Sequence, residues 1–282
     1  MGLSWMVARA VKSYLALLPE SYAVKTARKL RFYLDAYAGE DEVLTSPVGP
    51  LRIAGVRRSL GQASDVAIQE PETIRWLDAC LGSDDVLWDI GGNIGLYSVY
   101  AAKRGARAVY AFEPFAATYL QLVKNLVANG VDGRVRALNI ALADTLGVAD
   151  LALRSFEPGY ATTLAAQEFA SDQVERQIGT QYVVTISGVD LVAAVPEARP
   201  DHVKIDVDGA EPLVLRGLAP LLPGLKTLFV EVLDVFQAEF ERDFAPMIAA
   251  AGLVEIPVEA PSKGRNRAFV RPIAFTPTVR AI

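Results

Sequence analysis

The segment from residue 86 to residue 95 constrains the fold of this chain more than any other. It reads VLWDIGGNIG, an apolar run with an acid near its end and then a glycine-rich turn. Mostly apolar residues follow at 96–102. This pattern predicts a buried strand, a tight turn and a helix. Glycine is needed where the backbone turns sharply or where a ligand approaches it closely. The free N–H groups that begin the helix would face such a ligand.

The glycines of this turn stand at 91, 92 and 95, so the turn lacks the G-x-G-x-x-G pattern of dinucleotide-binding proteins. Asp89 would repel a pyrophosphate, whereas it suits a ligand that carries an amino group and a sulfonium. The D-x-G-x-N-x-G arrangement therefore predicts S-adenosylmethionine rather than NAD. The alternative interpretation is an ordinary strand-to-helix turn that is capped by Asn93.

A second acid stands at the expected distance from this turn. Residues 108–112 form another apolar run, and Glu113 follows it, 18 residues after Gly95. In nucleoside-binding α/β folds an acid about 20 residues after the glycine turn accepts hydrogen bonds from the ribose hydroxyls. We therefore expect Glu113 to hold a ribose.

Strand and helix patterns alternate from residue 86 onward, which predicts a mostly parallel, doubly wound α/β sheet. Residues 253–258 and 268–271 are expected to close it as an antiparallel pair. Residues 155–181 are the least patterned part of this region. A long irregular loop is often a lid or a binding loop, so substrate recognition is one interpretation, and a simple surface excursion is the other.

Composition excludes several classes of protein. The 282 residues carry a net charge of −5 with a pI of about 5.1, which argues against a nucleic-acid partner. A single cysteine rules out an internal disulfide, and a single histidine, His202, rules out sites built from several imidazoles. The sequence contains no apolar run of about 18 residues and no clear signal peptide. We therefore predict a cytoplasmic protein without a transmembrane segment.

Residues 1–70 are predicted to form an N-terminal extension, and residues 71–282 the main domain. Within the extension, helical spacing covers residues 4–36 and a hairpin pattern covers residues 43–56. The helices are expected to pack on the main domain or on a partner subunit, which would give a homodimer. The alternative is a basic amphipathic surface that touches a membrane.

Residues 202–211, HVKIDVDGAE, form a strand that ends in charged residues and turns through glycine into a helix. The carboxyl ends of parallel strands are where α/β sheets bind ligands. This position makes Lys204, Asp206, Asp208 and Glu211 candidate site residues. The alternative is a solvated run of charges.

With these motifs together, the chain resembles the FkbM family of S-adenosylmethionine-dependent methyltransferases, over roughly residues 86–258. The resemblance rests on the turn at 89–95 with Phe112-Glu113-Pro114, on residues 139–144 (NIALAD), and on residues 189–191 with 204–211. The family usually has Ala at Gly92 and Glu at Asp208, and Thr-Leu at residues 187–188. The resemblance implies a class I methyltransferase fold, a seven-stranded sheet with its last strand antiparallel. It also implies O-methylation of a hydroxyl on a sugar, a glycan or another small molecule.

On this hypothesis the expected cofactor-binding residues lie at the glycine turn and on the neighbouring strands: Asp89, Gly91, Gly92, Asn93, Gly95, Glu113 and Ala141. A hydroxyl acceptor must lose a proton, so a general base is expected. We predict Asp206 as that base, with Lys204 and Glu211 orienting it or the substrate. His202 is the alternative base, although it stands toward the start of its strand.

Oxygen ligands for a divalent cation are available at Asp206, Asp208 and Glu231, but the sequence is not sufficient to predict a metal site.

Two other functions remain open at this stage. One is a cofactor-binding module without catalysis, which would act in assembly through its N-terminal helices. The other is an NAD-linked oxidoreductase, against which the missing phosphate fingerprint argues.

Overall fold

The computed structural model describes residues 41–54, 70–159, 163–164, 177–259 and 265–272, with isolated residues between 12 and 26. Internal contacts divide the chain into two units, Met1–Glu42 with Ala54–Arg58, and Val43–Ile53 with Ser59–Ile282. Most of the first unit lies outside the described residues. The helices expected over residues 4–36, the homodimer and the membrane contact therefore stay predictions, as does the domain boundary at residue 70.

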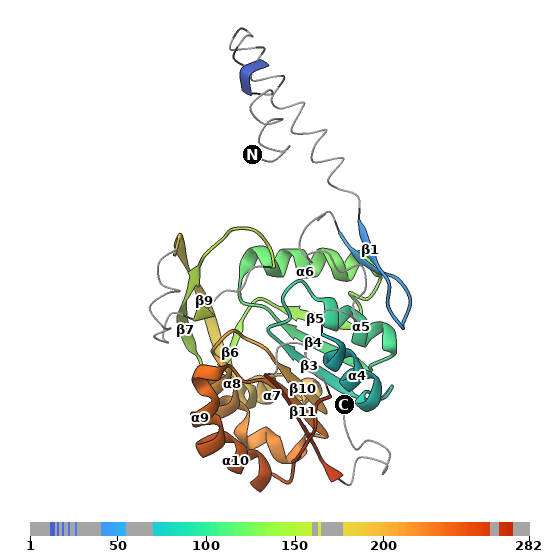
Figure 1. The fold of residues 1–282 in the computed structure, drawn as a ribbon, viewed down its shortest axis with the longest axis vertical. Coiled ribbons are helices and arrows are strands. Elements are labelled where there is room, and N and C mark those ends of the chain that lie inside the picture. The colour runs from blue at the N-terminus through green and yellow to red at the C-terminus, as the bar shows by residue number, and fades with distance from the viewer. Residues whose placement is uncertain are drawn as a thin grey trace. The chain divides into compact units, whose positions relative to one another are not determined.

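The second unit contains a seven-stranded sheet, whose strands lie in the order β12-β13-β11-β10-β3-β4-β5 (Figure 1). Strands β10, β11, β3, β4 and β5 run parallel, and β13 runs antiparallel to β11 and β12. This topology confirms the prediction of a doubly wound, seven-stranded sheet with its last strand antiparallel. The strands are β3 (Val86–Ile90), β4 (Ala108–Phe112), β5 (Val135–Leu138), β10 (His202–Ile205), β11 (Thr227–Glu231), β12 (Val254–Ile256) and β13 (Asn266–Val270).

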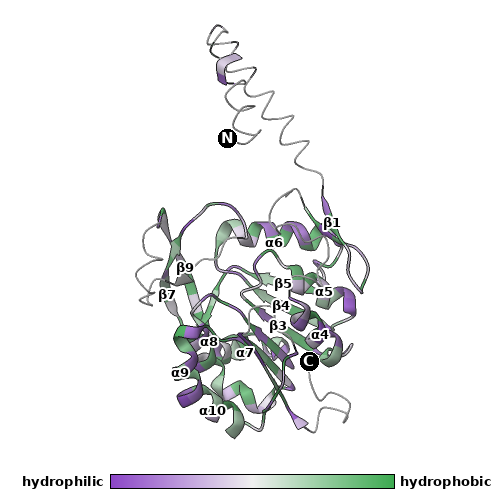
Figure 2. Cartoon of the chain, viewed as in Figure 1, coloured by the Kyte–Doolittle hydropathy of each residue, from purple (hydrophilic) through white to green (hydrophobic). Residues whose placement is uncertain are grey.

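Helices cover both faces of this sheet, which is why every residue of β3 is buried. One face packs Trp88 and Phe112 against apolar residues of α7 (Gly188–Ala194), α8 (Glu211–Leu218) and α10 (Ala245–Ala250). On the other face, Trp76 of α4 (Pro71–Cys80) stacks on Phe229 with ring centroids 5.1 Å apart. Helices α5 (Leu96–Arg104) and α6 (Ala116–Ala128) follow β3 and β4. Figure 2 shows the hydrophobic colours gathered on the central strands.

A second, four-stranded sheet has the order β6-β9-β7-β8. Its strands are β6 (Ala141–Ala143), β7 (Gly147–Leu153), β8 (Thr163–Leu164) and β9 (Gly179–Ser187). The sequence of residues 148–153 predicts a strand that forms one arm of a hairpin, and β7 does pair antiparallel with β9. The prediction that the irregular segment extends to residue 181 was wrong, because β9 already begins at Gly179. Strand β6 was not predicted, because its three residues are too few for alternation to show and its partner β9 lies far along the chain.

The other elements agree with the sequence except between β11 and α10. The hairpin expected over residues 43–56 is present as β1 (Glu42–Leu44) and β2 (Leu51–Ile53), which form a two-stranded sheet. The sequence predicts a helix near residues 244–251, but in the structure the helical region begins earlier. Helical turns already cover η4 (Asp234–Phe236), α9 (Gln237–Glu239) and the π-helical η5 (Phe240–Phe244). Among the described residues, no helix has both the length and the apolar character that crossing a membrane requires.

Candidate active site

The glycine turn lies between two strand ends and touches both. The backbone N–H groups of Gly91 and Gly92 both donate to the carbonyl oxygen of Phe112 at the end of β4, at 3.0 Å. Gly91 has a φ of +80°, and a Cβ at this position would overlap the backbone carbonyl oxygen of Asp206, beyond β10. Only glycine both adopts this positive φ without strain and leaves room for the Asp206 carbonyl oxygen. At Gly92, by contrast, a Cβ would make ordinary contacts of 3.4 to 3.5 Å, so alanine is sterically acceptable there.

Asp89 lies just before this turn and is completely buried. Its Oδ2 accepts a hydrogen bond of 2.6 Å from the Ser98 hydroxyl, in the first turn of α5. Its Oδ1 is buried and has no hydrogen-bond partner among the described residues. Burial raises the pKa of Asp89, although Lys204 and the Ser98 hydrogen bond oppose the shift. A buried carboxylate oxygen without a donor is costly, so this atom fits a ligand that supplies an N–H group.

Glu113 follows β4 and joins two loops of the site. Its Oε2 accepts from the backbone N–H of Asn93 at 3.0 Å, and its Oε1 accepts from that of Phe115 at 2.8 Å. Burial raises the pKa of Glu113 to about 7, although these two hydrogen bonds oppose the shift. Each carboxylate oxygen has two lone pairs, so both oxygens retain the capacity to accept from a ligand hydroxyl.

Residues after β5 close the same side of the site. The side-chain amide of Asn139 donates to the carbonyl oxygens of Glu113 and Pro114, at 2.8 and 2.9 Å. Ala141 is buried in β6 and belongs to the same hydrophobic cluster as Phe115. The structure therefore places Ala141 beside the turn that carries Glu113, and its contact with an adenine ring stays a prediction.

Lys204 is the cation of the site. It lies on β10 in register with Asp89 on β3, and its side chain is only 4% exposed. Its ammonium group lies 2.9 Å from Asp206 Oδ2 and 5.1 Å from the centre of the Tyr97 ring. Burial by itself lowers the pKa of Lys204, but Asp206, Asp89 and Glu70 outweigh it and the pKa is raised. Lys204 is therefore a fixed positive charge that orients Asp206, and it is not a proton acceptor.

Glu211 begins α8 and fixes the loop that carries Asp206 and Asp208. Its Oε1 accepts from the backbone N–H groups of Val207 at 3.3 Å and Gly209 at 3.1 Å. Its Oε2 is buried without a hydrogen-bond partner among the described residues, and burial raises its pKa to about 7. This geometry makes Glu211 an anchor for the loop backbone.

The structure also brings together three acids that the sequence marked as oxygen donors. Carboxylate oxygens of Asp206, Asp208 and Glu231 lie within 4.8 Å of one another at the ends of β10 and β11. Oxygen ligands in this arrangement suit a hard divalent cation. Acidic groups often cluster without an ion, so the grouping by itself is no evidence of a metal.

His202, the alternative base, is the first residue of β10 and is buried, at the opposite end of that strand from Asp206. Its ring nitrogens contact Asp85 Oδ2 at 3.0 Å and Thr227 Oγ1 at 2.7 Å. The His202 hydrogen bond, with help from Lys226, holds the pKa of Asp85 well below its ordinary value. His202 is therefore part of a buried polar network of the fold, and the structure removes it from the candidate bases.

Several residues near the site were missed by reasoning from the sequence. Ser98 holds Asp89, and its position in the first turn of the helix was a usable signal. Tyr97 donates from its hydroxyl to Glu70 Oε2 at 3.0 Å, so a residue that precedes α4 reaches the site. Gln181, on β9, contacts the turn after Glu113. No local pattern points to Tyr97, Glu70 or Gln181, because their contacts join distant segments.

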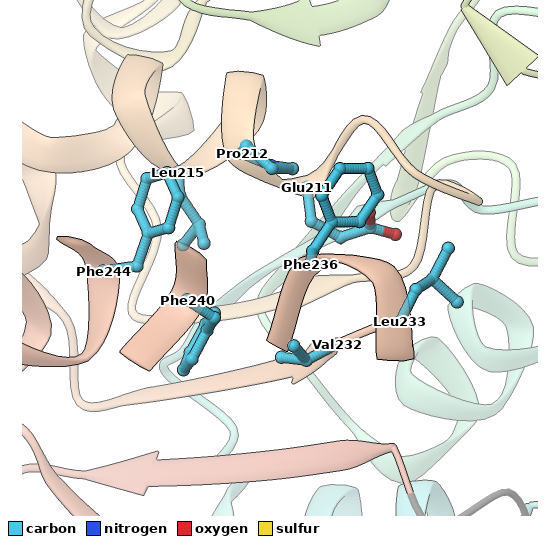
Figure 3. A pocket seen from close by; sticks show the side chains of 8 residues that line it. All are labelled: Glu211, Pro212, Leu215, Val232, Leu233, Phe236, Phe240 and Phe244. Carbon is cyan, nitrogen blue, oxygen red and sulfur yellow. The ribbon is translucent and has the colours of Figure 1, made fainter. Parts of the chain in front are cut away.

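A small apolar pocket adjoins this loop (Figure 3). Leu233 and Phe236 at its edge are half-buried, whereas Phe240 and Phe244 are buried. Glu211 is the one charged residue among those that line it. The lining is Glu211, Pro212, Leu215, Val232, Leu233, Phe236, Phe240 and Phe244. The pocket lies between the first residues of α8 and the segment that follows β11.

The strand order, with the glycine turn between the ends of β3 and β4, defines a class I methyltransferase fold. The chain belongs to the FkbM methyltransferase family, because the profile described as "Methyltransferase FkbM domain" matches residues 89–250. That region contains all the predicted cofactor-binding and catalytic residues.

Two relatives of known name are methyltransferases. The chain is 32% identical over 163 residues to the hexuronic acid methyltransferase AglP of Haloferax volcanii, covering 58% of this chain and 62% of the relative. It is 28% identical over 162 residues to methyltransferase sdnD of Sordaria araneosa, covering 50% of this chain and 62% of the relative. The chain thus spans less than two thirds of the length of either relative.

Among solved structures, methyltransferase FkbM from Methylobacillus flagellatus is 14% identical, with a TM-score of 0.45. The match covers 67% of this chain and 44% of that one.

Proposed function

We propose that this protein is an S-adenosylmethionine-dependent methyltransferase that methylates a hydroxyl of a sugar, a glycan or another small molecule. The observation that carries the proposal is the buried carboxylate of Asp89, with one oxygen unpartnered, beside a turn where only glycine fits at residue 91. Family membership supports methyl transfer, and the name of the Haloferax relative, a hexuronic acid methyltransferase, supports a sugar acceptor.

The proposed roles follow from the geometry. Asp89 accepts from the amino group of the cofactor, and Glu113 accepts from its ribose hydroxyls. The cofactor would supply an electrophilic methyl group on a sulfonium. Because β10 adjoins β3 on the side away from β4, a ligand that spans from Glu113 to Asp89 ends beside Asp206.

Asp206 is the proposed general base for the acceptor hydroxyl, with Lys204 holding its carboxylate in place at 2.9 Å. Glu211 holds the loop around Asp208 and has no proposed contact with the reacting atoms. Holding the two reactants in line supplies much of the catalysis in such a site.

Calorimetric titration with S-adenosylhomocysteine and, separately, with NADH tests the cofactor. We expect micromolar binding of S-adenosylhomocysteine and no binding of NADH. Binding of NADH alone would move the assignment to an oxidoreductase. Methyl transfer from labelled S-adenosylmethionine to hydroxylated acceptors separates an enzyme from a cofactor-binding module without catalysis.

The pKa of Glu113 gives the cofactor affinity a pH dependence. A ribose hydroxyl donates to the ionised carboxylate, and burial raises the pKa of Glu113 to about 7. The affinity for S-adenosylhomocysteine should therefore rise as the pH increases through about 7 and fall below it, with proton release on binding. Calorimetry from pH 6 to pH 8 in two buffers of different ionisation enthalpy measures both effects.

The matched variant is Glu113→Gln, which cannot titrate. We expect weaker binding in this variant and a flatter pH profile. An unchanged profile in Glu113→Gln would assign the titration to another group of the site and would count against the ribose role.

A further inference from the structure

Gln181 lies on β9, outside the motifs that identify the site, yet its side-chain amide makes two hydrogen bonds to the segment that carries Glu113. Its Nε2 donates to the carbonyl oxygen of Pro114 at 2.7 Å. Its Oε1 accepts from the backbone N–H of Ala116 at 3.0 Å. The amide therefore bridges the turn between β4 and α6 from the neighbouring sheet.

The second of these bonds has the chemistry of a helix cap. Ala116 is the first residue of α6, and the residue before it, Phe115, provides no side-chain cap. The first N–H groups of a helix have no partner inside the helix, so they need one from elsewhere. Gln181 supplies that partner across the sheets, while its amide nitrogen holds the preceding carbonyl.

The same short segment positions the carboxylate of Glu113. The backbone N–H of Phe115, between the two atoms that Gln181 binds, donates to Glu113 Oε1 at 2.8 Å. On the other side, Asn139 donates to the carbonyl oxygens of Glu113 and Pro114. Asn139, in the segment after β5, and Gln181, on β9, thus hold the turn from two distant parts of the chain, and the Phe115 N–H reaches Glu113 only while the turn keeps its shape.

We propose that Gln181 is a positioning residue for the cofactor ribose, which acts by fixing the 114–116 turn and through it the carboxylate of Glu113. The inference rests on the proposed role of Glu113.

The test compares two ligands in calorimetry: S-adenosylhomocysteine, and its analogue without the 2′ and 3′ hydroxyls. Gln181→Met preserves the length of the side chain and removes both hydrogen bonds. We expect this variant to lose about tenfold in affinity for S-adenosylhomocysteine, as for one to two lost hydrogen bonds, and little for the analogue. The ratio of the affinity for S-adenosylhomocysteine to that for the analogue reports the contacts of the ribose hydroxyls, and it should fall toward one.

Two further variants make the result specific. Gln177→Met is the matched control, because Gln177 is exposed and bonds only to Gly179 and Thr180 of its own hairpin; it should preserve the wild-type ratio. Gln181→Glu retains an acceptor for Ala116 but has no donor for Pro114, so its ratio should also fall.

The proposal is overturned if either Gln181 variant keeps the wild-type ratio of the two affinities. It is also overturned if a variant loses affinity equally for S-adenosylhomocysteine and for the analogue. Failure of the proposed function has a different signature. A wild-type protein that binds neither ligand refutes the cofactor, and one that binds both equally refutes the ribose role of Glu113.

Discussion

Replacing Gly91 by alanine is expected to lower the free energy of unfolding by at least about 4 kcal/mol. Two effects add up to this loss: the strain of a positive φ in a residue other than glycine, and the overlap of the new Cβ with its neighbours. Gly91 has a φ of +80°, and its missing side chain leaves room for the carbonyl oxygen of Asp206. An added Cβ would force the glycine turn away from the loop after β10. Since natural domains are stable by only about 5–15 kcal/mol, the variant should be partly unfolded or aggregate at 37 °C. Urea titration followed by circular dichroism measures the loss.

The neighbouring glycine gives a matched control. Gly92→Ala adds the same methyl group one residue further on, where the nearest atoms are 3.4 Å away at Leu122 and 3.5 Å away at Ala111. We expect this variant to retain the wild-type stability to within about 1 kcal/mol. Equal stability of the Gly91 and Gly92 variants would show that the turn does not pack on the Asp206 loop as described.

Asp89→Asn should abolish most cofactor affinity without weakening the fold. The change removes the charge that would pair with an amino group, and charge-assisted hydrogen bonds contribute about 1.5–3 kcal/mol, or roughly ten- to a hundredfold in affinity. Asn retains an oxygen for the Ser98 hydroxyl. Burial raises the pKa of Asp89, so burial makes its ionised form less favourable in the folded state than in water, whereas the attraction to Lys204 acts the other way. Asp206 still pairs with Lys204 in the variant, so we expect the two effects to offset and the unfolding free energy to stay within about 1 kcal/mol of wild type.

Calorimetry with S-adenosylhomocysteine and urea titration together test this separation of binding from stability. Asp132→Asn, at an exposed acid before β5, is the control and should change neither quantity. Undiminished binding in Asp89→Asn would place the cofactor elsewhere. A large loss of stability would show that Asp89 acts in the fold rather than at a ligand.

Much of the candidate site was predictable because its signals are local. A buried strand, a glycine turn and a helix leave a pattern within about a dozen residues, so the segment at 86–95 and Glu113 could be identified directly. The seven-stranded sheet with its last strand antiparallel came from the family resemblance, and its mostly parallel character came from the alternation of strands and helices. The start of the helical region after β11 was misplaced, because the π-helical turn at Phe240–Phe244 breaks the usual spacing.

The sequence by itself determined most of the elements, the side of the sheet where a ligand is expected and the acids that lie there, because these depend on residues that are neighbours in the chain. Only the tertiary structure decided how the side chains pair. Lys204 lies beside Asp89 through strand register, Tyr97 meets Glu70, and Gln181 bonds to Pro114 across 67 residues of chain. Such contacts form when distant segments pack together, and no periodicity along the chain records them. The same packing gives His202, which the sequence already placed toward the start of its strand, its contacts with Asp85 and Thr227.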